Sequence, residues 1–203
     1  MEFSQTPRDL PVRSNIAPTQ QVPIVRNAAD GSREMVMARF GLIPSWSKDG
    51  KVKFATFNAR VETVDTSNTY RSAFKTRRCL MVADGYYEWI TLPDKTKQPI
   101  RFVLEGGDTF AFAGLWERWH RGEQPITSCA MITCEPNALA KQYHDRMPVI
   151  LPPRHYDAWL DGSAGKEVLV PYSGNDLRAF PVSKRINNSR VEGDPTLIEP
   201  IAA

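Results

Sequence analysis

Apolar residues in this chain fall into short runs that turn residues separate, a pattern typical of strands rather than of long helices. Residues 34–40 alternate between apolar and polar positions, which predicts a strand with one buried face. Residues 100–104 and 109–115 flank the Gly-Gly turn at 105–108, which predicts a hairpin. Further strands are predicted at residues 22–25, 80–82, 127–133, 149–151 and 178–182.

Three segments carry helical signals. One helix is predicted to begin after a cap at Thr66 or Ser67 and to continue to about Lys75, because apolar residues there lie four apart. Short helices are also predicted at residues 136–143 and 152–160, where proline stands at the start. The sequence has no βαβ rhythm and no internal repeat. We therefore expect one α+β domain over residues 1–203, with an antiparallel, barrel-like β core and a few short helices.

Composition narrows the class of protein. Hydrophobic residues make up 41% and charged residues 24%, as in soluble globular proteins. A net charge of +3 is compatible with a nucleic-acid partner without proving one. No apolar run is long enough to span a bilayer and no signal peptide is visible, so we expect no membrane partner, a cytoplasmic location and a monomer.

The three cysteines, Cys79, Cys129 and Cys134, form an odd set without a CxxC pair. Disulfides and a zinc site are therefore not expected, and a reducing cytoplasm is the default compartment. We expect neither a metal nor an organic cofactor.

The clearest candidate for chemistry is Glu88, within Ala-Asp-Gly-Tyr-Tyr-Glu-Trp at residues 83–89. An apolar run at residues 80–82 precedes this stretch, and aromatic residues flank the carboxylate. An apolar setting raises the pKa of a carboxyl group toward the range useful for acid–base catalysis. The alternative is an ordinary outward-facing residue on a strand, and spacing alone favours that alternative.

Four fragments favour the catalytic interpretation of Glu88 over the outward-facing alternative, because they occur together and in order. They are Asn-Ile-Ala-Pro-Thr-Gln at 15–20, Asn-Ala-Arg-Val-Glu-Thr at 58–63, the Glu88 stretch at 83–89, and His-Asp-Arg-Met-Pro at 144–148. With the loop Gly-Leu-Ile-Pro-Ser-Trp at 41–46, they closely resemble the SRAP family, the SOS response-associated peptidases or abasic-site processing proteins. The resemblance runs from about residue 15 to residue 200. Each motif alone is weak, whereas four in order are a strong signal.

The resemblance implies binding of single-stranded DNA at abasic sites and formation of a covalent DNA–protein cross-link in the DNA damage (SOS) response. Members of the family use a cysteine at position two, which removal of the initiator methionine exposes. Its amine forms a Schiff base with the ring-opened deoxyribose, and its thiol then closes a thiazolidine. The peptidase name reflects removal of the residues ahead of that cysteine.

The resemblance also implies catalytic roles for three residues. Asn58 would orient the N-terminal nucleophile or the sugar, Glu88 would be the acid–base group, and His144 would be a second proton donor. These roles suit the chemistry, because the abasic aldehyde exists mostly as a closed hemiacetal and its opening needs a proton shuttle. A carboxyl group in an aromatic pocket and an imidazole supply such a shuttle near neutral pH.

Five further residues are implied as DNA contacts. Arg60 and Arg146 would hold phosphates, to which a guanidinium makes bidentate hydrogen bonds. Trp46 would wedge against bases, and stacking on single-stranded bases is worth roughly 1–3 kcal/mol each. Pro18 and Thr133 lie where the family touches the strand.

Each assignment has a structural alternative. His144 could be a capping or core residue, Asn58 could satisfy the backbone of a turn, and Trp46 could belong to the core. Arg60 could pair with Glu62 or another carboxylate as a solvated ion pair of little energetic value.

The N-terminus departs from the family, whose sequence begins Met-Cys-Gly-Arg. This chain begins Met1-Glu2-Phe3-Ser4, and its segment 1–14 is atypical. Three explanations stay open: a wrongly assigned or altered start, a member that binds DNA without cross-linking, or a reversible Schiff base on the Met1 amine. An α-amine titrates at roughly pH 7.7–8.0 and is partly neutral at pH 7.

Two rival functions follow from the same residues. The chain could be a non-catalytic module that shields damaged single strands, which predicts binding that weakens steeply with salt. It could also be a thiol hydrolase, which requires a cysteine sulfur within hydrogen-bond reach of His144.

Overall fold

The computed structural model describes residues 13–52, 54–191 and 193–201. Its strands are β1 (Gln21–Asn27), β2 (Arg33–Phe40), β3 (Asn58–Arg60), β4 (Arg78–Ala83), β5 (Tyr86–Thr91), β6 (Lys97–Leu104), β7 (Phe110–Trp119), β8 (Ile126–Cys134), β9 (Met147–Pro148), β10 (Ile150–Leu151) and β11 (Leu177–Pro181). Its helices are α1 (Arg71–Thr76) and α2 (Tyr156–Asp161), with 3-10 turns η1 (Ala140–Gln142), η2 (Pro153–His155), η3 (Lys166–Val168), η4 (Lys184–Asn187) and η5 (Pro195–Ile198).

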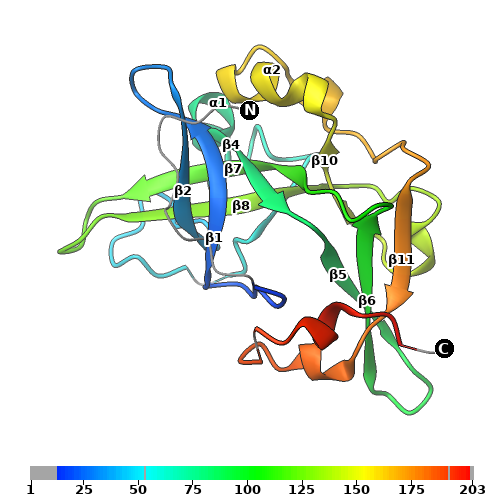
Figure 1. Ribbon diagram of the computed structural model, residues 1–203. Helices are drawn as coiled ribbons and strands as arrows, with labels where there is room; N and C mark the ends of the chain where they lie inside the picture. Colours follow the sequence, from blue (N-terminus) through cyan, green and yellow to red (C-terminus); the bar gives the residue numbers. More distant parts are fainter. Residues whose placement is uncertain (1–12, 53, 192, 202–203) are drawn as a thin grey trace.

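A closed barrel forms the centre of the molecule (Figure 1). Hydrogen-bonded neighbours follow the order β7, β4, β1, β2 and β8, and β8 pairs back onto β7. Four of these pairings are antiparallel, and β2 with β8 is parallel. A closed ring with an odd number of strands cannot alternate direction throughout, so one parallel pair is obligatory. The predicted α+β fold with a barrel-like core is confirmed, and its antiparallel character holds except at this closing pair and at β3.

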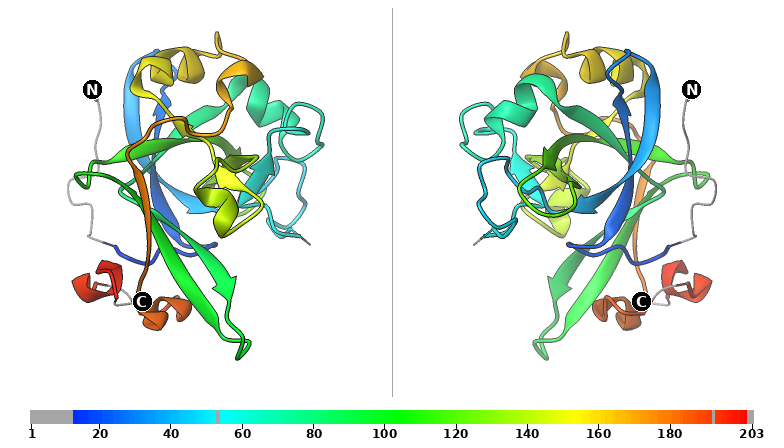
Figure 2. Two further views of the ribbon diagram at one scale, coloured as in Figure 1. Left: turned by 90° about the vertical axis from the view of Figure 1, so that its right-hand side faces the viewer. Right: turned by 90° about the vertical axis from the view of Figure 1, so that its left-hand side faces the viewer.

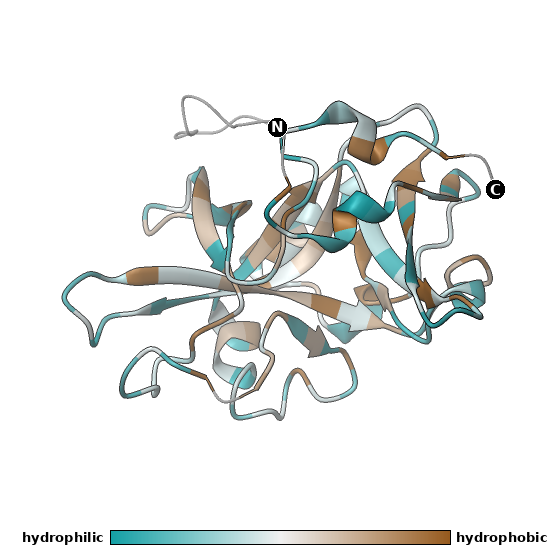
Figure 3. Cartoon of the chain, turned by 90° about the horizontal axis from the view of Figure 1, so that it is seen from below, coloured by the Kyte–Doolittle hydropathy of each residue, from teal (hydrophilic) through white to brown (hydrophobic). Residues whose placement is uncertain are grey.

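The barrel interior is filled by aliphatic side chains from successive strands. Ile24, Leu80, Leu115 and Ile132 are completely buried. Each such burial contributes roughly 1.5–3 kcal/mol relative to an exposed side chain. Figure 3 shows apolar residues concentrated on the central strands, whereas the connecting loops carry both polar and apolar residues. The alternating segment 34–40 forms β2 as predicted, but only Ala38 on this strand is buried and the other side chains are half-buried.

A second sheet of three strands, in the order β11, β6 and β5, stands beside the barrel (Figure 1). An aromatic cluster joins the two sheets: the Tyr86 ring stacks on Phe102 at 4.7 Å between centroids, and its edge meets the ring of Phe112 at 5.8 Å. Such pairs add about 0.5–1.5 kcal/mol beyond the area they bury.

The predicted hairpin between residues 100–104 and 109–115 is wrong. β6 pairs with β5 and β11, whereas β7 pairs with β4, β8 and β10. Gly106 and Gly107 both have positive φ, at 89° and 76°. This turn leads the chain from one sheet into the other instead of folding it back on itself.

The helices are shorter than predicted. α1 begins only at Arg71, and its N-cap is Tyr70 rather than Thr66 or Ser67. The predicted helix at 136–143 contains only the 3-10 turn η1, and the one at 152–160 consists of η2 followed by α2. Among the residues that the structure describes, no helix is both long and apolar enough to span a membrane.

The segment 13–20 is held against the C-terminal turns, seen in two further views in Figure 2. The buried side-chain amide of Asn15 donates to the carbonyl oxygens of Ile186, Asn188 and Val191 at 3.1–3.3 Å. The Tyr87 hydroxyl donates to the Ser14 carbonyl at 2.6 Å. These contacts fix the edge of the cavity described next.

Candidate functional site

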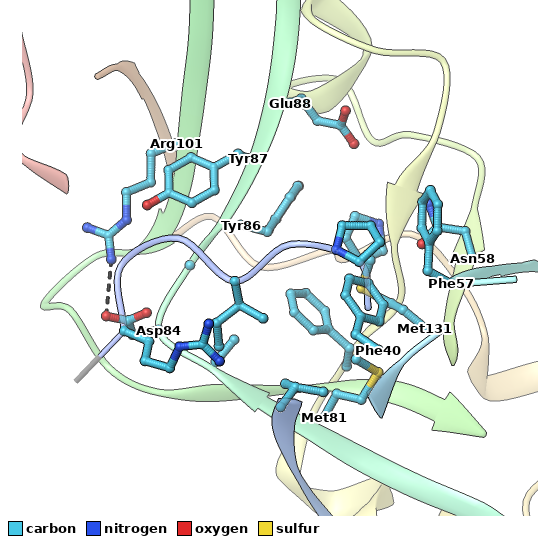
Figure 4. A pocket seen from close by; sticks show the side chains of 18 of the residues that line it. Phe40, Phe57, Asn58, Met81, Asp84, Tyr86, Tyr87, Glu88, Arg101 and Met131 are labelled. Atoms are coloured by element: carbon cyan, nitrogen blue, oxygen red, sulfur yellow. Dashed lines mark hydrogen bonds and ion pairs between the residues drawn. The ribbon is translucent and has the colours of Figure 1, made fainter. Parts of the chain in front are cut away.

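A large open cavity of about 1120 Å³ is lined by residues of both sheets and of the segment 13–18. Its lining includes Asn58, Glu88 and His144, so the three predicted catalytic residues come together although they lie far apart in the sequence. Figure 4 shows Glu88 and Asn58 on different walls of this cavity, with Phe40 and Met81 on the side away from Glu88.

β3 delivers Asn58 and Arg60 to one side of the sheet, because side chains two apart on a strand point the same way. Ala59 between them is fully buried, whereas both neighbours are exposed. Parallel pairing with β8 sets Asn58 opposite Met131 and Arg60 opposite Thr133.

The backbone of Asn58 is anchored by the Tyr70 hydroxyl, which donates to its carbonyl at 3.1 Å. Asn58 lies in a strand rather than in a turn, and its side chain makes no hydrogen bond within the described ranges. The turn alternative raised for this residue is thus wrong, and the amide remains available to a ligand.

Glu88 lies on β5, two residues after the buried Tyr86 and on the same face of the strand. Its side chain is only 20% exposed. Burial raises the pKa of Glu88 to about 7, and the nearby imidazole of His144 opposes that shift. A group with this pKa exchanges protons near neutral pH, as acid–base catalysis requires. The outward-facing alternative for Glu88 is wrong.

His144 follows η1, and its backbone amide donates to the Ala140 carbonyl at 2.9 Å. The His144 Nδ1 lies 3.0 Å from the backbone amide of Arg146 and 3.2 Å from its carbonyl oxygen, so it accepts from the first or donates to the second according to the tautomer. Nδ1 also lies 3.9 Å from the Glu88 carboxylate and 3.3 Å from that of Asp145. The imidazole is 42% exposed, so a core role is wrong.

Arg146 connects the His144 turn to β3 and β8. Its guanidinium donates to both carboxylate oxygens of Glu62, at 2.6 and 3.0 Å, and to the Thr133 carbonyl at 2.7 Å. The guanidinium lowers the pKa of the Glu62 carboxyl through these hydrogen bonds. The alternative raised from the sequence paired Glu62 with Arg60. In the structure, Glu62 forms its ion pair with Arg146 instead.

The remaining predicted DNA contacts divide into two groups. Arg60, Pro18 and Thr133 line the cavity with the catalytic candidates, and so does Arg146. Trp46 does not line it and lies instead on the loop before β3. Its ring is 52% exposed, and its Nε1 donates to the Asn68 carbonyl at 3.2 Å. A core role for Trp46 is therefore wrong.

The cysteines are all buried, and burial raises the pKa of the thiols of Cys129 and Cys134 to about 12 and about 11. The pKa of Cys79 is also raised by burial. No hydrogen bond joins any of the three sulfurs to His144 in the described part of the chain, which removes the basis of the thiol hydrolase alternative. Nor do the described residues contain a group of three His, Cys, Asp or Glu side chains that could hold a metal ion.

Sequence reasoning missed the Glu62–Arg146 pair and the apolar interior of the cavity. Glu62 and Arg146 lie in two of the four fragments, but nothing local indicates that they meet. The expectations for the N-terminal nucleophile and for the Met1 amine fall on residues 1–12, outside the described residues.

Comparison with known proteins identifies the family. The family model "SOS response associated peptidase (SRAP)" matches residues 2–189. The abasic site processing protein YoqW of Bacillus subtilis is 40% identical over 192 residues, which cover 91% of this chain and 84% of that protein. The abasic site processing protein HMCES of Xenopus tropicalis is 30% identical and aligns with 81% of this chain and 57% of its own length.

Solved structures share the fold. A protein from Bacteroides thetaiotaomicron superposes with a TM-score of 0.77 at 23% identity, covering 91% of this chain and 82% of that one. A protein from Bordetella bronchiseptica superposes with a TM-score of 0.75 at 30% identity, covering 86% and 90%. The order of the four fragments, the barrel and the family match agree, and the chain belongs to the SOS response associated peptidase (SRAP) family.

Proposed function

We propose that this chain binds single-stranded DNA at abasic sites and processes the opened deoxyribose, with Glu88 and His144 as its acid–base pair. The observation that carries the proposal is Glu88, a carboxyl group with a pKa of about 7 that lies 3.9 Å from an imidazole nitrogen in an open cavity. The relatives named as abasic site processing proteins supply the substrate class.

The chemistry begins with opening of the sugar ring. The hemiacetal hydroxyl loses its proton while the ring oxygen gains one, so a single group that accepts and donates near pH 7 can serve both needs. The pKa of Glu88, which burial raises to about 7, fits this role. His144 serves as the second proton carrier, and the Asn58 amide holds the sugar oxygen or the nucleophile in place.

The covalent step joins an amine of the protein to the aldehyde. The amine adds to the carbonyl carbon, and water leaves as the imine forms, for which the departing hydroxyl needs a proton. In the family mechanism the cysteine thiol then adds to the imine carbon and its proton passes to nitrogen, which closes the thiazolidine. Position two of this sequence is Glu2, which offers no thiol for the ring closure, whereas an α-amine can still form the imine.

DNA binding rests on cations around the cavity. The exposed Arg60, which has no ion pair among the described residues, offers its guanidinium on the same side of β3 as Asn58, and Arg146, which is partly exposed and paired with Glu62, adds further N–H donors. Trp46, on the loop that precedes β3, offers an exposed ring on which a base can stack. We expect a monomer that associates with the nucleoid only through DNA.

Denaturing gel electrophoresis tests the proposal. This chain, and a version that begins Met-Cys-Gly-Arg, are each incubated with a single-stranded oligonucleotide that carries one abasic site. A heat-stable shifted band is expected for the version with cysteine. For the chain as written, a band is expected only after borohydride reduction of the imine. An oligonucleotide without the lesion is the control. If neither protein shifts under either condition, the chemistry is absent and a DNA-shielding module replaces this proposal.

A further inference from the structure

Four basic residues lie in α1 or directly after it, and the structure divides them into two pairs. Arg78 is buried, and its guanidinium lies over two aromatic rings at 4.7 and 4.5 Å from their centroids. Arg77 contacts the Glu117 carboxylate of β7 at 2.9 Å. Arg71 and Lys75, which we call the α1 cations, are exposed and have no ion pair within the described ranges. The first pair stabilises the fold, and the second pair has no such task.

The carboxylates close in sequence to the α1 cations are paired with other residues. Glu62 and Asp65 are the only acidic residues of the segment 58–77, which leads from β3 to the end of α1. Their carboxylates contact Arg146 at 2.6 Å and Lys166 at 3.1 Å. The positive charge of the α1 cations is therefore available to an anion from outside the protein.

The α1 cations also lie on one face of their helix. Side chains four positions apart on a helix are neighbours, with about 5–6 Å between their Cβ atoms. Ala73, which lies between them in the sequence, is buried on the opposite side and packs α1 onto the core. Arg71 and Lys75 therefore project together into solvent, where a guanidinium and an ammonium group can contact neighbouring phosphates of one strand.

Two hydrogen bonds connect α1 to the candidate site. The hydroxyl of Tyr70, directly before α1, donates to the Asn58 carbonyl at 3.1 Å, so the helix begins one tyrosine side chain away from β3. The exposed ring of Trp46 lies against the turn that leads into α1, because its Nε1 donates to the Asn68 carbonyl at 3.2 Å. β3, Trp46 and α1 are therefore neighbours at the surface.

We propose that Arg71 and Lys75 hold phosphates of the DNA strand on one side of the abasic site. The strand would leave the cavity at Arg60, pass the Trp46 ring and reach α1. This inference rests on the proposed function, because the lesion must sit beside Glu88 for its flanking strand to reach the helix. It adds a contact surface that covers one flank of the lesion and that recognises the backbone rather than the bases.

Salt-dependent binding tests the proposal without any covalent chemistry. Three single-stranded oligonucleotides carry a tetrahydrofuran abasic analogue, which has no aldehyde. One continues on both sides of the lesion, one ends directly after it on the 5′ side, and one ends directly after it on the 3′ side. Fluorescence anisotropy at several salt concentrations gives the slope of log affinity against log salt. Loss of the flank that reaches α1 should lower this slope by at least about 1.4, twice the value of about 0.7 for one phosphate of a single strand.

The double variant Arg71→Gln/Lys75→Gln identifies that flank. Glutamine removes both charges and has a helix propensity close to that of arginine and lysine. On the oligonucleotide with both flanks, the slope should be lower than for wild type by about 1.4. On the oligonucleotide without the α1 flank, the variant and wild type should have the same slope. The melting temperature of the free protein should stay level, because both side chains are exposed and unpaired.

The double variant Arg121→Gln/Arg154→Gln is the matched control. It makes the same change in net charge at two exposed residues, one in the turn between β7 and β8 and the other in η2. Neither residue lines the cavity. Its slope should stay near the wild-type value on all three oligonucleotides.

Separate outcomes distinguish this inference from the proposed function. If wild type prefers the abasic oligonucleotide to an intact one, but the α1 double variant keeps the wild-type slope, the inference is overturned and the function stands. An equal decrease in the control variant would also overturn the inference, because net charge alone would then explain the effect. So would a decrease that is the same on all three oligonucleotides, because the α1 cations would then contact no particular flank. If wild type binds abasic and intact oligonucleotides equally, the proposed function fails, and the assignment of a flank fails with it.

Discussion

The guanidinium of Arg146 contacts both carboxylate oxygens of Glu62, at 2.6 and 3.0 Å, across 84 positions of sequence. The same guanidinium donates to the Thr133 carbonyl, and the Arg146 backbone amide lies 3.0 Å from the His144 Nδ1. Arg146 is thus held by the protein before any DNA arrives. Arg60, on the neighbouring strand, has no ion pair within the described ranges. Replacement of Arg60 and replacement of Arg146 should therefore have different effects on DNA affinity and on the reaction rate.

Loss of Arg60 should weaken DNA binding and little else. Arg60→Ala removes one phosphate contact, which lowers the slope of log affinity against log salt by about 0.7 for a single strand. The rate of product formation by protein saturated with DNA should stay near the wild-type value. Anisotropy at several salt concentrations and a single-turnover gel measure the two quantities. An unchanged salt slope would place Arg60 outside the DNA contact surface.

Arg146→Lys should affect the reaction rate more than the affinity for DNA. Lysine keeps the charge but cannot reproduce the bidentate pair with Glu62. The turn that carries His144 then loosens, so the single-turnover rate should fall by more than the affinity for DNA. Arg60→Lys is the matched control and should preserve both. An equal loss of affinity in the two lysine variants would mean that Arg146 serves as a phosphate contact alone.

Glu88 should make folding stability depend on pH. Its pKa rises from 4.5 in the unfolded chain to about 7 in the folded protein, so the folded state binds the extra proton between these values. The stability that Glu88 contributes is present below pH 4.5 and is lost as pH rises through 7. Glu88→Gln, which stays neutral, should be more stable than wild type by about 3 kcal/mol at pH 8.5, and nearly equal to it at pH 4.

Urea unfolding at a series of pH values measures this difference, and Glu199→Gln at an exposed position is the control. The same Glu88→Gln variant should lose about 10²–10⁴-fold in the rate of cross-link formation, the usual contribution of general acid–base catalysis. Equal stability of the two proteins across the pH range would show that the Glu88 carboxyl is not desolvated.

The local patterns of the sequence predicted what depends on neighbours in the chain. The buried run at residues 80–82 became β4, and the aromatic setting of Glu88 was found because strand alternation is a local property. Closure of the barrel was not predictable, since the Phe40–Cys129 pairing is parallel and joins strands far apart. For the same reason the Glu62–Arg146 pair escaped notice. The turn at 105–108 led to the wrong prediction of a hairpin. Two glycines allow the chain to pass from one sheet to another as readily as they allow it to fold back on itself.

Trp46 should contribute to binding through stacking on bases rather than through the fold. Its ring is 52% exposed, so Trp46→Ala removes little buried area and should change the unfolding free energy by less than about 1 kcal/mol. Affinity for single-stranded DNA should fall by roughly 1–3 kcal/mol, the contribution of one stacked base. Trp46→Phe should recover part of that loss, because a smaller ring still stacks.

Val170→Ala, at a side chain of similar exposure (53%), is the control for a surface change. Tryptophan fluorescence quenching on addition of DNA, reduced in the Trp46→Phe variant, would report the contact directly. Unchanged affinity in Trp46→Ala would leave the loop at 41–46 with a structural role alone.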